Sequence, residues 1–377
     1  MSDEFKRKLA AYEKGELTDA EIEDFEKELD KLESYHEFLE DNQGDETSEI
    51  NQKKQKKILR RGKWKARVQT AFFALAIFVL FTIVASIFTS IYYAWGTPDR
   101  NEVLASIIDH TLTVTDPYGY MGHTSTHTNA YFSMTATREM TKRVGDERIE
   151  VGEMNVNFIF SKIGIPEEKH YGTISQNRPQ FIHPASTDQG EADWEQLEKL
   201  PEGTVVSAYL SFSELIGTEQ VLSLFEEKDM ELLWLAVDTG KETDWNSFSE
   251  PIGFPSYPIW HQDDMILTSH EEEEGPFWSK TVSEGYVSPD YEEGDEEILH
   301  QQFLKTLRFL KEHENMTDYL TFGRLNLSER IDYLENNGFL HYGVVITGPT
   351  KEVLKLREES WVKYIDVDEV AFWNWDR

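Results

Sequence analysis

The stretch VQTAFFALAIFVLF (residues 68–81) opens a run of 31 residues between Arg67 and Asp99 that holds no charged side chain. A helix needs about 20 apolar residues to cross the ~30 Å hydrocarbon layer of a bilayer. The run therefore predicts a transmembrane helix over residues 68–95, long enough to cross with some tilt. A buried core helix is the alternative, but soluble segments of this length without a charge are rare.

The flanks of this run indicate its orientation. Residues 53–67 hold nine basic residues and no acid, which predicts a cytoplasmic N-terminus and an extracellular C-terminal part. The basic residues are also expected to bind anionic membrane lipids. The apolar run begins too far along the chain, and is too long, for a cleaved signal peptide. The residues expected to anchor the helix at its flanks are Lys63, Trp64, Lys65, Arg67, Tyr92, Tyr93 and Trp95.

Charge is unevenly distributed on the two sides of the run. Residues 1–52 hold 18 acids and 6 bases, and residues 68–377 hold 53 acids and 22 bases. An acidic inside segment disfavours nucleic acid and favours a basic protein partner. The excess of acidic residues in the outside part is better explained by adaptation of an external protein to a salty or alkaline environment than by a specific cation-binding site. The absence of cysteine excludes disulfides and thiolate metal sites.

The inside segment, residues 1–41, is predicted to form two amphipathic helices. A capping box, Thr18 to Glu21, opens the second helix. Isolated helices of this size are marginally stable, so a partner is expected to cover their apolar stripes; a hairpin packed only on itself is the alternative. The polar residues 42–52 predict a linker, which the basic juxtamembrane segment continues to residue 67. The apolar residues expected to provide core and contact are Leu9, Tyr12, Ile22, Phe25, Leu29 and Leu32.

The outside part, residues 96–377, shows strand patterns and later helix patterns, so the predicted class is α+β. Leu112–Thr115 is predicted to be a strand, and 131–142 and 148–161 to form a hairpin through Gly145. Two later stretches predict β-α-β units with parallel strands. Region 240–296 is predicted to be a long loop. The two units are expected over 205–212, 218–227 and 231–237, and over 341–347, 350–359 and 362–367.

Candidate catalytic and metal-binding patterns are weak. His123 and His127 are four residues apart, but their surroundings predict a loop rather than a metal-binding helix. The acid runs lack the spacing of a calcium loop. Gly348-Pro-Thr-Lys351 lacks the spacing of a phosphate loop and is typical of a helix start. The closing Phe372-Trp-Asn-Trp375 is predicted to be a core strand rather than an exposed anchor. Nothing in these patterns favours an enzyme, and no cofactor is expected.

Two regions carry a resemblance to a known family. Leu9-Ala-Ala-Tyr-Glu-Lys-Gly-Glu-Leu-Thr18 resembles the opening of anti-sigma domains, and Tyr342-Gly-Val-Val-Ile-Thr-Gly-Pro-Thr-Lys-Glu352 with Phe372–Trp375 resembles sigma-factor-regulator domains. The chain is thus similar to membrane anti-sigma factors of Gram-positive bacteria. Many such domains bind zinc through His and Cys, but the matching positions here are Glu28, Leu32 and Tyr35, which implies a zinc-less form.

The resemblance implies that the inside helices hold an extracytoplasmic-function (ECF) sigma factor, of the sigma-M kind, at the membrane. The outside part would then sense the envelope, and a second small membrane protein is a further implied partner. Two other functions stay open: an anchored ectodomain with a binding or enzymatic role, and a structural component of a membrane complex. Small polar residues at helical spacing predict a helix-packing face in the span, formed by Thr82, Ser86 and Ser90.

Overall fold

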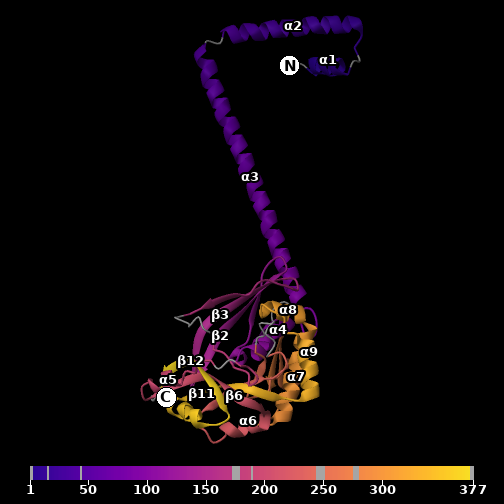
Figure 1. The fold of residues 1–377 in the computed structure, drawn as a ribbon. Helices are drawn as coiled ribbons and strands as arrows, with labels where there is room; N and C mark the ends of the chain where they lie inside the picture. The colour runs from indigo at the N-terminus through magenta and orange to yellow at the C-terminus, as the bar shows by residue number, and fades with distance from the viewer. Residues whose placement is uncertain are drawn as a thin grey trace. The chain divides into compact units, whose positions relative to one another are not determined.

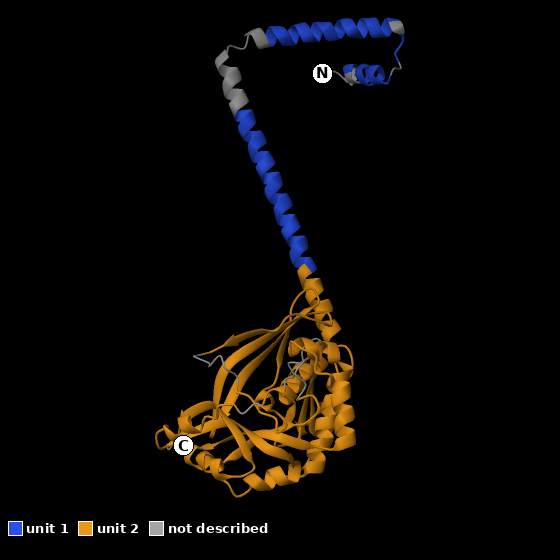
Figure 2. Cartoon of the chain, viewed as in Figure 1, with its two compact units in different colours: residues 1–81 blue, residues 82–377 orange. Residues whose placement is uncertain are grey.

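The computed structural model describes residues 3–14, 17–42, 45–171, 179–187, 190–242, 251–274 and 280–373. The chain divides into two compact units, residues 1–81 and 82–377, coloured separately in Figure 2. The division falls within one long helix, between Phe81 and Thr82. We refer to the parts as the N-terminal unit and the C-terminal unit.

The N-terminal unit begins with helices α1 (Asp3–Glu13) and α2 (Asp19–Asn42), as predicted. The backbone N–H of Thr18 donates to the Glu21 carboxylate at 3.0 Å, and the Thr18 hydroxyl donates to it at 2.6 Å. These bonds lower the pKa of Glu21. They satisfy an N–H group at the start of α2, where backbone donors lack partners within the helix.

Helix α3 (Asp45–Tyr93) runs through 49 residues. Residues 45–52, whose composition predicts a linker, are helical instead and form the first two turns of α3, where acidic residues near a helix N-terminus are favourable. The segment Lys54–Tyr93 is long and apolar enough to cross a membrane, with a mean hydropathy of 2.7 in an 18-residue window of which no residue is buried. Length and composition therefore support a membrane-spanning helix.

After the last turns of α3, the C-terminal unit continues with α4 (Arg100–Thr115), so the strand predicted at Leu112–Thr115 is wrong. The Asp99 side chain caps this helix by accepting from the backbone N–H of Glu102 at 2.7 Å. The side chains buried along α4 recur at helical rather than alternating spacing, which the four-residue window hid. They are Leu104, Ile107, Ile108, Thr111, Thr113 and Val114.

The first sheet has the order β1-β2-β3-β4, and β5 also pairs with β3. The hairpin predicted on either side of Gly145 is confirmed: β2 and β3 pair from Val144 and Glu147 out to Ser133 and Ile159. Gly145 has a φ of 60°, which a residue without a Cβ adopts readily. The strands are β1 (Ser125–Thr128), β2 (Ser133–Val144), β3 (Glu147–Ile159), β4 (Lys162–Ile163) and β5 (Glu167–His170).

The second sheet has the order β12-β6-β11-β7-β8, and all its hydrogen-bonded neighbours are antiparallel (Figure 1). β6 and β7 run parallel to each other with β11 between them, and β11 and β12 run parallel with β6 between them. The predicted strand-helix-strand segments therefore interleave as split β-α-β units, not as an ordinary parallel sheet. The elements are β6 (Thr204–Gly217), α6 (Thr218–Phe225), β7 (Glu231–Val237), β8 (Gly253–Pro255), β11 (Leu340–Pro349), α10 (Thr350–Lys355) and β12 (Val362–Phe372).

Both faces of the second sheet are covered. One face packs against α7 (Glu296–Glu312) and α9 (Leu327–Asn337) through a large apolar cluster. On the other face, Trp234 is fully buried and its indole N–H donates to the carbonyl of Thr113 at 3.1 Å. The remaining helices are α5 (Trp194–Glu198), α8 (Glu314–Leu320) and the short 3-10 turns Gly119–Met121, Gln262–Asp264 and Leu356–Glu358.

Two regions differ from their predictions. Region 240–296, predicted to be a loop, contains β8 and an antiparallel pair, β9 (Ile266–Glu274) and β10 (Lys280–Val287). At the C-terminal end, Phe372 is 74% exposed rather than part of a core. Trp373 donates its backbone N–H to Gly203 at 2.7 Å, while Asn374 and Trp375 lie outside the described residues.

Candidate functional site

The α1–α2 hairpin is held together by three aromatic side chains. The ring of Phe25 on α2 lies 5.4 Å from the rings of both Phe5 and Tyr12 on α1. Phe25 is 2% exposed and Phe5 is 9% exposed. The Tyr12 hydroxyl also donates to the Glu26 carboxylate at 3.2 Å. Phe25 is thus a core residue of the hairpin and is not available to a partner in this conformation.

Beside this aromatic core lies an open groove of about 900 Å³. Leu9 from α1 and Leu29 and Leu32 from α2 line it, together with Tyr35. Leu32 remains 42% exposed and Tyr35 remains 61% exposed. Exposed apolar surface of this kind, bordered by polar residues, is typical of a protein interaction site.

The border of the groove is acidic. Glu26, Asp30 and Glu33 line it, together with His36. Helix α2 as a whole holds eleven acidic and two basic residues. An acidic border around an apolar groove complements a basic partner, and complementarity of this kind raises association rates and selects among partners.

The structure divides the six residues predicted to form the helix-pair apolar set. Leu9, Leu29 and Leu32 line the groove, and Phe25 belongs to the core. Tyr12 packs on that core and Ile22 is half-buried. Tyr35 was not among the six, although it continues the α2 stripe by three residues past Leu32, as do Phe38 and Leu39 beyond it.

The predicted membrane flank differs between its two ends. Trp64 and Trp95 are each 69% exposed, and the neighbouring basic residues on α3 are exposed too. Tyr93, in contrast, is 1% exposed and packs in an apolar cluster of the C-terminal unit. Its hydroxyl donates to the carbonyls of Phe132 and Phe160 at 3.1 and 2.8 Å. Tyr93 therefore fixes the end of α3 to the fold.

The hydroxyls of the predicted helix-packing face are bonded within the chain. Ser86 and Ser90 donate to the backbone carbonyls four residues earlier in α3, at 2.9 and 3.2 Å. The Thr82 hydroxyl lies 2.7 Å from the hydroxyl of Tyr131 in the loop between β1 and β2. Thr82 thus joins the last part of α3 to the loop between β1 and β2, within the C-terminal unit.

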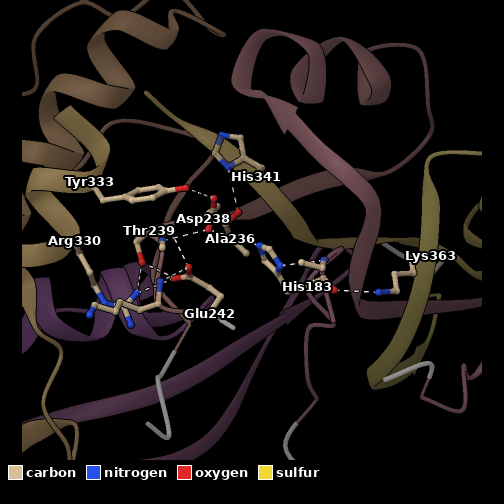
Figure 3. A network of polar contacts seen from close by, with 12 residues as sticks. His183, Ala236, Asp238, Thr239, Glu242, Arg330, Tyr333, His341 and Lys363 are labelled. Atoms are coloured by element: carbon tan, nitrogen blue, oxygen red, sulfur yellow. Dashed lines mark hydrogen bonds and ion pairs between the residues drawn. The ribbon is translucent and has the colours of Figure 1, made fainter. Parts of the chain in front are cut away.

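A second cluster of interest is a buried polar network at the end of β7 (Figure 3). The guanidinium of Arg330 is 1% exposed and donates to Glu242 at 2.9 Å and to the hydroxyl of Thr239. The Tyr333 hydroxyl donates to Asp238 at 2.8 Å. These bonds connect α9 to the segment that follows β7.

The electrostatics of this network fit a structural clamp. Burial raises the pKa of Asp238, but His183 and Tyr333 stabilise its carboxylate and lower that pKa to about 2. Burial lowers the pKa of Arg330, and Glu242 opposes the shift. Arg330 and Glu242 therefore neutralise one another, as buried charges must, the carboxylate of Asp238 is stabilised by hydrogen bonds, and the arrangement of these residues positions no activated nucleophile.

The two histidines considered as a metal pair do not share a helix. His127 lies in β1 and His123 precedes that strand. Four residues of extended chain span about 13 Å, too far for a shared ion. Within the described part of the chain, no group of three or more His, Asp or Glu residues is placed to hold a metal.

Comparison with known proteins places these features in context. Residues 56–149 match the sigma factor regulator N-terminal family, and residues 197–369 match the sigma factor regulator C-terminal family. The chain is 29% identical to the "Probable anti-sigma-M factor YhdL" of Bacillus subtilis (strain 168) over 385 residues, covering the whole of both chains. No solved structure matches the chain. The α1–α2 hairpin lies outside both family matches and inside the full-length alignment.

Proposed function

Because the chain belongs to the sigma factor regulator family of anti-sigma factors, we propose that its α1–α2 hairpin holds an ECF sigma factor at the membrane. A sigma factor held in this way is withheld from RNA polymerase, so its genes stay repressed. The observation that carries the proposal is the open apolar groove lined by Leu9, Leu29 and Leu32 and bordered by acids. Sigma factors present basic surfaces to DNA, which an acidic hairpin complements.

The proposed arrangement places α1 and α2 in the cytoplasm and the folded part that follows α3 outside. Nine basic residues at 53–67, without an acid among them, support this orientation. The acidic C-terminal unit then reports envelope conditions through α3. We assign it no catalytic step, because in its buried polar network Arg330 pairs with Glu242, and Asp238 accepts a hydrogen bond from Tyr333.

Two charge reversals on α2 test the proposed binding surface. Glu33 lines the groove, whereas Asp24 is nine residues away and therefore about 180° around the helix. The full-length chain in nanodiscs is titrated with each purified ECF sigma factor of the host. We expect Glu33→Lys to slow association roughly tenfold at low salt, because it places a positive charge against a basic partner, and Asp24→Lys to have a much smaller effect.

Two results would contradict the proposal, each at a different step. If no ECF sigma factor of the host binds the full-length chain, the anti-sigma role is refuted. If one binds but Glu33→Lys and Asp24→Lys behave alike, the groove is not the contact surface. An anchored envelope protein with no cytoplasmic role predicts the first outcome.

A further inference from the structure

A loop of the first sheet packs against the last three turns of α3. The Thr82 hydroxyl is 2.7 Å from that of Tyr131, and two turns further on the Thr89 hydroxyl accepts from the backbone N–H of Phe132 at 2.8 Å. Both partners belong to the loop that connects β1 and β2. Figure 1 shows β2 and β3 reaching toward this end of α3. The loop thus lies along the helix rather than beyond its end.

A second loop joins the first through aromatic contacts. Phe160, which follows β3, stacks on Phe132 with 4.7 Å between ring centroids. Tyr92 of α3 packs edge-on against both rings, at 5.5 and 5.9 Å. The Tyr93 hydroxyl bonds the backbone carbonyls of both loops. We call residues 128–133 and 159–161 the collar.

The length of the apolar helix places the collar at membrane depth. From Val68 to Phe81, ahead of the collar, there are 14 residues, which span about 21 Å of helix. The hydrocarbon layer is ~30 Å thick and needs about 20 residues, which from Val68 end near Ile87. Tyr131 bonds the helix at Thr82, several residues before that point.

The ends of β2 and β3 that lie next to α3 carry no charge, whereas the far ends of these strands are rich in charge. Residues 128–137 and 154–161 hold no charged side chain, although the chain carries a formal charge of −34. These residues form the collar and the adjoining halves of β2 and β3, which pair with each other. The opposite halves of the two strands, residues 138–144 of β2 and 147–153 of β3, are rich in charged side chains. An uncharged end next to α3 avoids the cost of placing charges in lipid.

The collar also presents apolar side chains outward, some of them at strained positions. Tyr131 is 44% exposed, Ile159 is 59% exposed and Phe160 is 46% exposed. Tyr131, Phe132 and Phe160 have φ values of 62°, 58° and 55°, a region that bulky side chains rarely adopt. Gly or Asn would fit these turns with less strain; packing on Tyr92 accounts for the rings of Phe132 and Phe160, but it leaves Phe160 and Tyr131 nearly half exposed.

We propose that the collar inserts into the leaflet of the bilayer on the C-terminal side of α3, with its aromatic rings at the boundary of acyl chains and headgroups. The proposal rests on the membrane crossing by α3 that the proposed function includes. Aromatic rings are favoured at this boundary. The packing of lipids around the collar then acts directly on Thr82, Thr89 and Tyr93 of α3.

The absence of cysteine in the chain allows a direct measurement. The full-length protein carries one new cysteine at a time, Tyr131→Cys or Ile159→Cys, labelled with an environment-sensitive fluorophore. It is reconstituted in phosphatidylcholine–phosphatidylglycerol vesicles that contain lipids spin-labelled on the acyl chain. Ile77→Cys, within the uncharged run, is the membrane control, and Phe372→Cys, exposed in the second sheet, is the aqueous control.

We expect strong quenching at Ile77, slightly weaker quenching at Tyr131, intermediate quenching at Ile159 and none at Phe372. If Ile77 is quenched while both collar probes behave like Phe372, α3 crosses the membrane and the collar proposal is overturned. Unlabelled cysteines at the two collar positions that react readily with a water-soluble maleimide, in vesicles that hold no other protein, would overturn it too, and would make the surface a docking site for another protein. Absence of quenching at Ile77 would refute the membrane crossing itself.

Discussion

Truncation of Tyr35 tests whether the groove on the N-terminal unit is a contact surface. An aromatic side chain buries about 200 Å² when fully covered, and Tyr35 is 61% exposed in the free chain. A partner that covers it therefore removes about 120 Å² from water, which is worth up to about 3 kcal/mol at ~25 cal/mol per Å². Because every 1.4 kcal/mol changes an affinity tenfold, Tyr35→Ala is expected to weaken sigma-factor binding by about 10- to 100-fold.

The assay is equilibrium binding of the purified sigma factor to the full-length chain in nanodiscs. Tyr35 is largely exposed, so its truncation is expected to leave the helix content and the melting temperature of the chain unchanged. Tyr319→Ala, at a tyrosine of the C-terminal unit that is 52% exposed, is the matched control and should bind like the wild type. Binding by Tyr35→Ala within twofold of the wild type would refute the assignment of the groove.

Three further outcomes follow from the buried residues. Phe25→Ala is expected to destabilise the α1–α2 hairpin by about 3–5 kcal/mol and to abolish sigma-factor binding with it, measured by circular dichroism and the same titration; retained helix and affinity would contradict its core role. Arg330→Met leaves Glu242 buried without its partner and should destabilise the C-terminal unit by about 3–5 kcal/mol, measured by calorimetry. The double variant Arg330→Met/Glu242→Gln should recover part of this loss, and no recovery would contradict the pairing of Arg330 with Glu242. Burial lowers the pKa of His110 to about 3 and that of His261 to about 4. As the pH falls below about 6.5 the unfolded chain takes up these two protons before the folded chain does, so the free energy of unfolding decreases toward pH 4 by about 1.4 kcal/mol per pH unit for each histidine. A melting temperature that does not change between pH 7 and 5 would contradict this.

Local patterns predicted much of the secondary structure. The β2–β3 hairpin follows from two alternating segments separated by Gly145, and α2 follows from its cap at Thr18 and its apolar stripe. Helix α4 was missed at Leu112–Thr115, because four residues that alternate in polarity also fit the end of a helix. Such short windows leave the period undetermined.

Contacts between distant segments carried no signal in the single sequence. Nothing local shows that β11 inserts between β6 and β7, since strand order depends on packing across more than a hundred residues. The same holds for the site. The spacing of Phe25 and Leu32 predicts that they share one face of α2, but only the position of α1 makes the first a core residue and the second a groove residue. The collar likewise depends on the proximity of Tyr131 and Phe160 to α3.

The central claim is that this chain represses an ECF sigma factor through its cytoplasmic hairpin. The most direct test is transcript profiling of a strain that carries Tyr35→Ala in the full-length chain, compared with the wild type and with Tyr319→Ala. The account predicts that the genes of one ECF sigma factor rise together in the Tyr35→Ala strain alone, at an unchanged level of the protein in the membrane. An unchanged transcript profile in that strain, and equally in a strain that lacks the whole chain, would contradict it.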